Sequence, residues 1–372
     1  MRTAILLAVA AGSALAHHSA APHFDLEKTV ELQATITKFE FVNPHGYVYF
    51  TFAGTPWRCE LPARLALQRL GWTQDLFPAG RKITIKGAPA RREENVCMLT
   101  SFVREDGREF SRTEVITDAN PLAKNVVASR PAQVNGQPNL QGVWLAQAGP
   151  GGPGPNGKGK GKDKGGKGKG DKGDFKGKGD KGDFKGKGKG GPGGPSMVEM
   201  TAAGEAAFKA YDQRFDDPAL KCNPANILFG WTHDQHVNEI AQSKKEVTLK
   251  YGYMDFVRTI HLNQTEHPKK ITPSTAGHSI GKWEGDVLVV DTVGFLPGVL
   301  IPISGVMHSA QMHVVERFSV SGDTLTRTYR VEDPLYLKAA YTGSDVMSIS
   351  REPYQKYNCV ELSGKNNIRP KQ

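Results

Sequence analysis

The chain has 372 residues and a formal net charge of +10, but nearly all of this charge comes from one segment. Residues 149–195 consist mainly of Gly, Lys, Asp and Pro and hold 13 Lys and 5 Asp, a net charge of +8. The rest of the chain is therefore close to neutral, which excludes a strongly basic folded face of the kind that attracts nucleic acid.

The first sixteen residues have the pattern of a secretory signal peptide. Arg2 precedes an apolar run at 5–11, and Ala-Leu-Ala at 14–16 forms a small-x-small cleavage site. This run is too short to cross a bilayer as a helix and no later run is long enough, so we expect no transmembrane segment. An uncleaved N-terminal anchor is the alternative. The pattern predicts a periplasmic or secreted protein.

Cleavage after residue 16 would leave His17 with a free amine beside its imidazole. The amine, this ring and one further imidazole could bind copper, because nitrogen ligands suit Cu(II). The arrangement resembles the histidine brace of lytic polysaccharide mono-oxygenases and periplasmic copper carriers. His45, His23 and His18 are the candidates for the further ligand, and His45 is favoured because it sits at a strand turn that the N-terminal arm could reach. The alternative is an exposed arm with solvated histidines.

Residues 17–110 predict a small five-stranded barrel. Period-2 alternation of apolar side chains indicates strands, and an amphipathic stretch that begins with Pro62 indicates one short helix. Three strands, a helix and two strands is the order of an OB fold, which by itself assigns no function. The strands are expected at 30–42, 46–54, 56–61, 81–89 and 96–104, with the helix at 62–70.

Four cysteines in an exported protein predict disulfide bonds. Cys59 and Cys97 precede the Gly/Lys tract, and Cys222 and Cys359 follow it. Three pairings are formally possible. Pairing within each half is favoured because it needs no contact across a flexible tract. The OB fold supports the first pair, since it places its third and fifth strands side by side.

Several short motifs of the first half also indicate its family. They are His17-His18-Ser19 at the mature start, Phe24-Asp25, and Phe41-Val42-Asn43-Pro44-His45 followed by alternating aromatic residues. With these motifs, residues 17–110 resemble a family of exported bacterial domains of unknown function. The resemblance implies no activity.

A connector and a low-complexity tract follow the first domain. Residues 111–139 have no clear period and contain three prolines, which favours a connector. Within the tract at 149–195, GDKGDFKGK occurs twice in tandem, and its low apolar content predicts disorder. A solvated linker is the favoured interpretation, and a polycation that binds polyanions is the alternative. A strand at 140–145 precedes the tract, so we expect the tract to be an insertion within the second domain.

Residues 140–372 predict a second, larger barrel of antiparallel strands with one helix at 200–215. The strand at 140–145 contains Gly142-Val143-Trp144, and with this motif the domain resembles the lipocalins and their calycin relatives. Motifs at 277–286 and 291–295 are similar to a conserved hypothetical exported family, which implies no chemistry. Further strands are expected at 236–243, 246–254, 256–262, 278–285, 286–295, 312–320, 323–331 and 345–353.

Five polar residues on the predicted strands are the candidates for a ligand site in the second barrel. If these side chains point inward, they line a polar interior; the alternative is that they form buried pairs that fix strand register. No nucleophile elbow, zinc-protease motif or phosphate loop is present, so no catalytic residue is assigned. The candidates are Arg258, His278, Asp291, Glu316 and Arg317.

These patterns together predict an exported, non-catalytic binding protein with a small or apolar ligand in its C-terminal barrel. The alternative is a copper carrier or oxidase built on His17. A third hypothesis is attachment to polyanions through the Gly/Lys tract, without specific recognition of nucleic acid.

Overall fold

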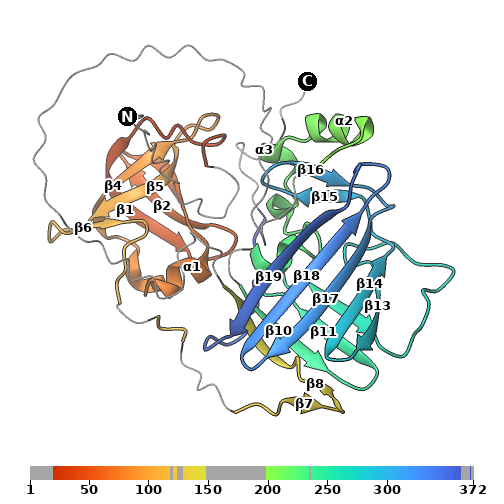
Figure 1. Ribbon diagram of the computed structural model, residues 1–372. Coiled ribbons are helices and arrows are strands. Elements are labelled where there is room, and N and C mark those ends of the chain that lie inside the picture. Colours follow the sequence, from red (N-terminus) through yellow and green to blue (C-terminus); the bar gives the residue numbers. More distant parts are fainter. Residues whose placement is uncertain are drawn as a thin grey trace, which may run out of the picture.

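The computed structural model describes residues 20–117, 120–123, 129–147, 198–233, 236–361 and 369, which form two closed β barrels (Figure 1). The mainly β fold predicted from the sequence is therefore confirmed. The predicted signal peptide, His17, His18 and the Gly/Lys tract lie outside the described residues. None of the helices in the described part of the chain has the length and apolar character that a bilayer crossing requires.

The first barrel has the strand order of an OB fold, as the sequence predicts. Its sheet runs β3-β2-β1-β4-β5, and parallel pairing between β3 and β5 closes it. A short strand, β6, extends the sheet beside β5. The elements are β1 (Val30–Glu40), β2 (Gly46–Phe52), β3 (Thr55–Leu61), α1 (Arg64–Arg69), η1 (Gln74–Leu76), β4 (Lys82–Pro89), β5 (Val96–Val103) and β6 (Glu109–Ser111).

Alternating side chains fill the first barrel. On β1, Leu32, Ala34 and Ile36 are buried while the residues between them are more exposed, so one face of the strand supplies the core. Cys59 on β3 and Cys97 on β5 are register partners and form the predicted disulfide. Gly87 on β4 lies so close to this bridge that a Cβ there would be 2.8 Å from the Cys97 sulfur.

The second barrel has nine strands, and its first strand is separated from the others in the chain. The strand β9 (Gly142–Ala146) pairs with both β10 and β19. The segment that contains the Gly/Lys tract therefore leaves and re-enters the same barrel. The barrel strands after β9 are β10 (Val237–Gln242), β11 (Glu246–Lys250), β12 (Val257–His261), β13 (His278–Glu284), β14 (Val287–Val293), β17 (His313–Ser321), β18 (Thr324–Glu332) and β19 (Tyr341–Ile349).

One strand pair of this barrel differs from the antiparallel order expected from the sequence. Ile260 on β12 and Ser279 on β13 are partners in a parallel pairing. A two-residue turn cannot join parallel neighbours, because the chain must return along the barrel before the next strand begins. The loop at 262–277 is long enough to do this. It appears as the teal loop at the right of Figure 1.

The helix predicted at 200–215 is two shorter helices, α2 (Ala202–Ala210) and α3 (Gln213–Asp216). Thr201 caps α2 by accepting the Gly204 N–H at 3.1 Å, and Asp212 caps α3 by accepting the Arg214 N–H. The second cap interrupts the longer helix. The remaining elements are η2 (Pro218–Lys221), α4 (Phe229–Thr232) and two hairpins, β7 (Gln133–Val134) with β8 (Gln137–Pro138) and β15 (Gly298–Ile301) with β16 (Val306–His308).

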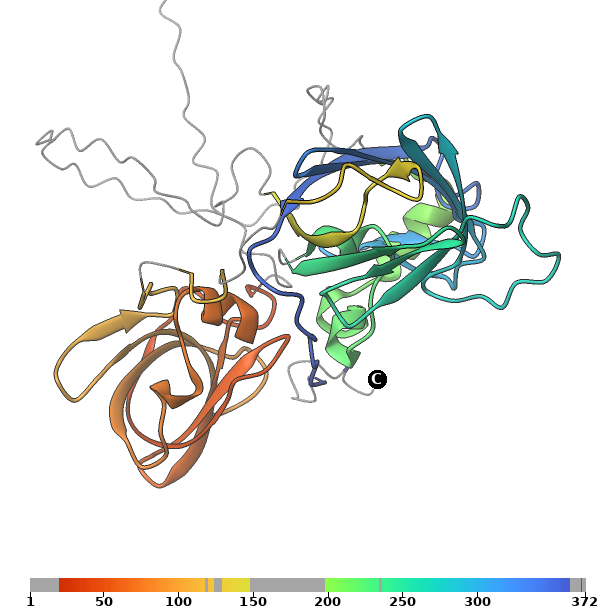
Figure 2. The same ribbon diagram turned by 90° about the horizontal axis from the view of Figure 1, so that it is seen from below.

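The C-terminal tail, residues 350–361, runs between the two barrels (Figure 2). Glu352 in this tail is buried, and it accepts hydrogen bonds from Arg69 at 2.9–3.0 Å. Asn43 donates from Nδ2 to the Tyr357 carbonyl at 2.6 Å. The predicted disulfide between Cys222 and Cys359 ties the tail to the second barrel. The tail thus connects the barrels through both covalent and polar contacts.

Candidate functional site

Two of the five candidate residues, Arg258 and Glu316, meet inside the second barrel. Their side chains are 1% and 0% exposed, and Arg258 Nη2 lies 2.5 Å from Glu316 Oε2. Arg327 Nη1 lies 3.3 Å from the other carboxylate oxygen. Arg258 also donates hydrogen bonds to Ser279 and Thr292. Burial alone would lower the pKa of Arg258, but the Glu316 carboxylate raises it overall.

Arg327 connects the Arg258–Glu316 pair to the segment at 227–232, which leads into and forms α4. It pairs with Asp345, and it donates hydrogen bonds to the carbonyls of Ile227 and Leu228, just before α4. Trp231 on α4 is 1% exposed and packs in the barrel core. Side chains of the protein itself therefore occupy the interior. Arg258 and Glu316 match the alternative of buried pairs that hold strands in register.

The other three candidates lie on the outer face of the same barrel. Asp291 and His278 are partly exposed there. Arg317 follows Glu316 along β17, points outward and pairs with Glu284 at 3.2 Å. The structure therefore brings Arg258 together with Glu316 and His278 close to Asp291, but it does not gather all five residues into one site.

Asp291 is the centre of a histidine cluster that sequence reasoning identified only in part. Its carboxylate contacts His267 Nε2 at 2.8 Å and His313 Nε2 at 2.7 Å. His267 Nδ1 lies 2.8 Å from His278 Nδ1, and the ring of His261 stacks on that of His278. The hydrogen bond with His313 lowers the pKa of Asp291 and raises that of His313. Burial and the neighbouring histidines lower the pKa of His278.

His45, the favoured third ligand of the copper hypothesis, lies in a buried polar pair of the first barrel. Its Nδ1 is 3.1 Å from Glu60 Oε1, and the side chain is 6% exposed. His23 is also buried. Burial raises the pKa of Glu60 to about 7, even though a hydrogen bond from Tyr47 favours the ionised carboxylate.

This shift predicts a pH dependence of stability. A carboxyl group with a raised pKa in the folded state stabilises the protein at low pH, and this contribution is lost as the pH rises from about 4.5 to about 7. The free energy of unfolding therefore falls as the pH rises, and we expect Glu60→Gln to make this fall smaller by roughly 3 kcal/mol. Urea unfolding between pH 4 and pH 8 measures it. The variant Glu105→Gln, at an exposed position of the same barrel, should keep the wild-type slope, and an equal slope in Glu60→Gln would contradict the prediction.

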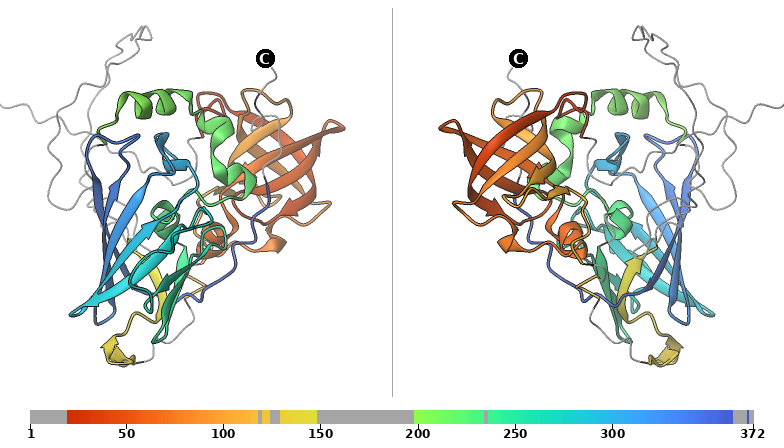
Figure 3. Two further views of the ribbon diagram at one scale, coloured as in Figure 1. Left: turned by 90° about the vertical axis from the view of Figure 1, so that its right-hand side faces the viewer. Right: turned by 90° about the vertical axis from the view of Figure 1, so that its left-hand side faces the viewer.

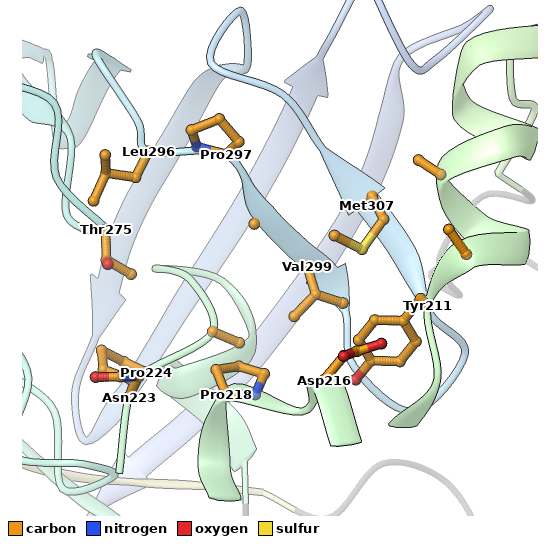
Figure 4. A pocket seen from close by; sticks show the side chains of 14 residues that line it. Tyr211, Asp216, Pro218, Asn223, Pro224, Thr275, Leu296, Pro297, Val299 and Met307 are labelled. Atoms are coloured by element: carbon orange, nitrogen blue, oxygen red, sulfur yellow. The ribbon is translucent and has the colours of Figure 1, made fainter. Parts of the chain in front are cut away.

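A cavity of about 600 Å³ lies at the rim of the second barrel. It is bounded by α2, α3, η2 and the β15–β16 hairpin, and Figure 3 shows α2 lying across the end of the barrel. Val299 and Met307 of the hairpin and Leu296 give it an apolar wall (Figure 4). The polar groups are few. They are Tyr211, Asp216, Asn223 and Thr275.

Tyr211 is the most informative polar group of this cavity. Its hydroxyl is buried and has no hydrogen-bond partner among the described residues. Burial and the nearby carboxylates, among them Asp217 and Asp216, raise the pKa of Tyr211 well above its ordinary value, so the group is a neutral donor. Most buried hydroxyl groups in proteins have a hydrogen-bond partner, so a ligand in the cavity can supply the partner that the Tyr211 hydroxyl lacks.

Sequence reasoning did not find this cavity. Its walls come from segments that are far apart in the chain, 207–225 and 275–307, and no periodic pattern links them. Asp212 and Asp217 cap the short helices beside it, but a helix cap does not by itself indicate a cavity.

Residues 5–98 match the model of a family described as a family of unknown function (DUF6152). The first barrel is thus similar to an uncharacterised domain family, as its motifs predict, and the match does not extend to the second barrel. No curated protein and no solved structure matches the chain.

Proposed function

We propose that the protein is exported and binds a small, mainly apolar molecule in the cavity at the rim of its second barrel. The observation that carries the proposal is the cavity itself. Its volume of about 600 Å³ lies within the range of small-molecule sites, and its wall combines apolar side chains with a few polar groups. The unpaired Tyr211 hydroxyl supports a ligand with one hydrogen-bonding group.

The position of the cavity changes the hypothesis drawn from the sequence. The barrel interior contains the Arg258–Glu316 pair and Trp231, so the ligand site moves to the end of the barrel. The predicted signal peptide and the two disulfides support export. No catalytic step is part of the proposal.

Copper binding at the mature N-terminus is the alternative. His17 and His18 lie outside the described residues. The contact between His45 Nδ1 and Glu60 is of the kind that often orients metal-bound histidines. The His45 ring is buried, however, so a third ligand there would require the arm to reach an enclosed group. The rim cavity is the better-supported site because all of its walls are described.

A tryptophan scan of α2 tests the cavity as a binding site. Ala207 lines the cavity, whereas Ala206, its neighbour on the same helix, is exposed and does not line it. We expect Ala207→Trp to weaken binding of the neutral fluorophore N-phenyl-1-naphthylamine about tenfold, because the indole fills part of the cavity. A tenfold change in affinity is about 1.4 kcal/mol, and the loss of a few buried contacts between fluorophore and cavity costs more than that. Fluorescence titration of the full chain measures this.

The matched variant Ala206→Trp should bind the fluorophore as the wild type does. Native mass spectrometry of protein purified from the periplasm should also show a bound small molecule that Ala207→Trp lacks. Equal affinities in the two variants, or a wild type that binds no fluorophore, would exclude the rim cavity as the site.

A further inference from the structure

The histidine cluster on the outer face of the second barrel does not line the rim cavity and has no role in the binding proposed there. Four histidines come together there from separate elements: His261 from β12, His267 from the following loop, His278 from β13 and His313 from β17. All four are partly exposed, so solutes can reach them. Four imidazoles, two of which contact the Asp291 carboxylate, do not contribute to an apolar core.

The proton positions in this cluster follow from the partners of each ring. Asp291 Oδ1 lies 2.8 Å from His267 Nε2, and a carboxylate oxygen accepts hydrogen bonds, so His267 donates its proton from Nε2. His267 Nδ1 then faces His278 Nδ1 at 2.8 Å, and one of these two nitrogens must donate to the other. A histidine ring that carries its one proton at Nε2 accepts at Nδ1, so the proton between the rings belongs to His278. One proton therefore occupies the space between two imidazole nitrogens.

A metal ion can replace that proton. Zinc–nitrogen bonds are about 2.0–2.1 Å long, which in a tetrahedral site places two ligand nitrogens about 3.3 Å apart. The two Nδ1 atoms lie 2.8 Å apart, so the rings need to separate by about 0.5 Å. His278 also has to move its proton to Nε2. In the described part of the chain, no three His, Cys, Asp or Glu side chains are arranged to hold a metal ion. The site therefore forms only when the rings separate and the His278 proton moves.

We propose that His267, His278 and His261 bind a divalent transition-metal ion such as Zn²⁺ on the outer face of the second barrel. His267 and His278 supply the facing Nδ1 atoms. His261 is the third ligand because its ring is stacked on that of His278, with 5.2 Å between ring centroids, and it has to turn to direct a ring nitrogen at the ion. Water completes the coordination.

Asp291 has the position of a supporting residue in this site. Ligating histidines commonly donate their other N–H to a carboxylate, which fixes the ring orientation and makes the ligand nitrogen more basic. The contact between His267 Nε2 and Asp291 Oδ1 has this form. His313 binds the second oxygen, Oδ2, and so holds the carboxylate in place from the other side without being a ligand itself.

Isothermal titration with Zn²⁺ tests the site. The protein should be the full chain with one extra residue before His17, which blocks the terminal amine, and without a histidine tag. We expect one Zn²⁺ per chain and weaker binding at lower pH, because protons compete for the same nitrogens. His267→Ala, His278→Ala and His261→Ala should each weaken binding about tenfold or more, and Asp291→Asn about 10- to 100-fold.

Arg317→Gln is the control, because Arg317 lies on the outer face of the same barrel and pairs with Glu284 instead of the histidine cluster, and it should keep the wild-type affinity for Zn²⁺. Thermal melting without zinc should give similar midpoints for all variants, since these side chains lie on the surface. The proposal is overturned if the wild type binds no Zn²⁺, or if the double variant His267→Ala/His278→Ala keeps the wild-type affinity and stoichiometry.

Discussion

Replacing Glu316 with alanine should lower the free energy of unfolding by about 3–5 kcal/mol. The variant leaves two buried guanidinium groups without the carboxylate that lies 2.5 Å from Arg258 and 3.3 Å from Arg327. Arg327 keeps Asp345, but Arg258 keeps only neutral partners, among them Ser279 and Thr292. An unpaired buried charge accounts for most of the expected loss. Equilibrium unfolding in urea, followed by tryptophan fluorescence, measures it.

The next residue along β17 supplies the control. Arg317 points to the opposite face and makes an ion pair with Glu284, and both side chains are nearly half exposed. Exposed pairs of this kind contribute about 0–1 kcal/mol, so Arg317→Ala should be almost neutral. A loss below about 1 kcal/mol in Glu316→Ala would mean that the network does not stabilise the barrel.

The contrast between Glu316 and Arg317 shows what period-2 patterning can predict. Glu316 has the same parity as the buried residues Val314 and Phe318, so alternation places it inside the barrel. Asp291 alternates with Val290 and Thr292, which are buried in the structure, and so it belongs to the opposite, outer face. The same logic predicts both barrels, and it supports the Cys59–Cys97 bridge because the third and fifth strands of an OB fold are neighbours. The bridge between Cys222 and Cys359 is favoured on other grounds, because it needs no contact across the Gly/Lys tract.

The outer face was harder to recognise from the sequence, because it is not uniformly polar. Val289 and Val293 share the outer parity of Asp291, so alternation along β14 separates two faces without saying which is buried. His267 lies in a loop, where no period applies, and only the folded chain brings it to Asp291. Both proposed sites therefore depend on contacts between distant segments, which one sequence does not encode in any local pattern.

Removing the disulfide between Cys222 and Cys359 is the second change with a large expected effect. The bridge spans 137 residues, and closing a loop of that length stabilises a folded chain by up to about 5 kcal/mol through the entropy of the unfolded state. The double variant Cys222→Ser/Cys359→Ser should lose much of this. Because Val360 donates a backbone hydrogen bond to Asn43, release of the bridge should also free the tail from the first barrel.

Hydrogen exchange with mass spectrometry separates this effect from general destabilisation. In Cys222→Ser/Cys359→Ser, exchange should rise in the tail at 350–361 and around η2, while β3 and β5 keep wild-type protection. The matched variant Cys59→Ser/Cys97→Ser opens a shorter loop of 38 residues and should show the reverse pattern, with a loss of up to about 4 kcal/mol. If the tail stays protected without its bridge, then its polar contacts are sufficient. Those contacts include the partly buried Arg69–Glu352 pair, which would then hold the barrels together without the covalent link.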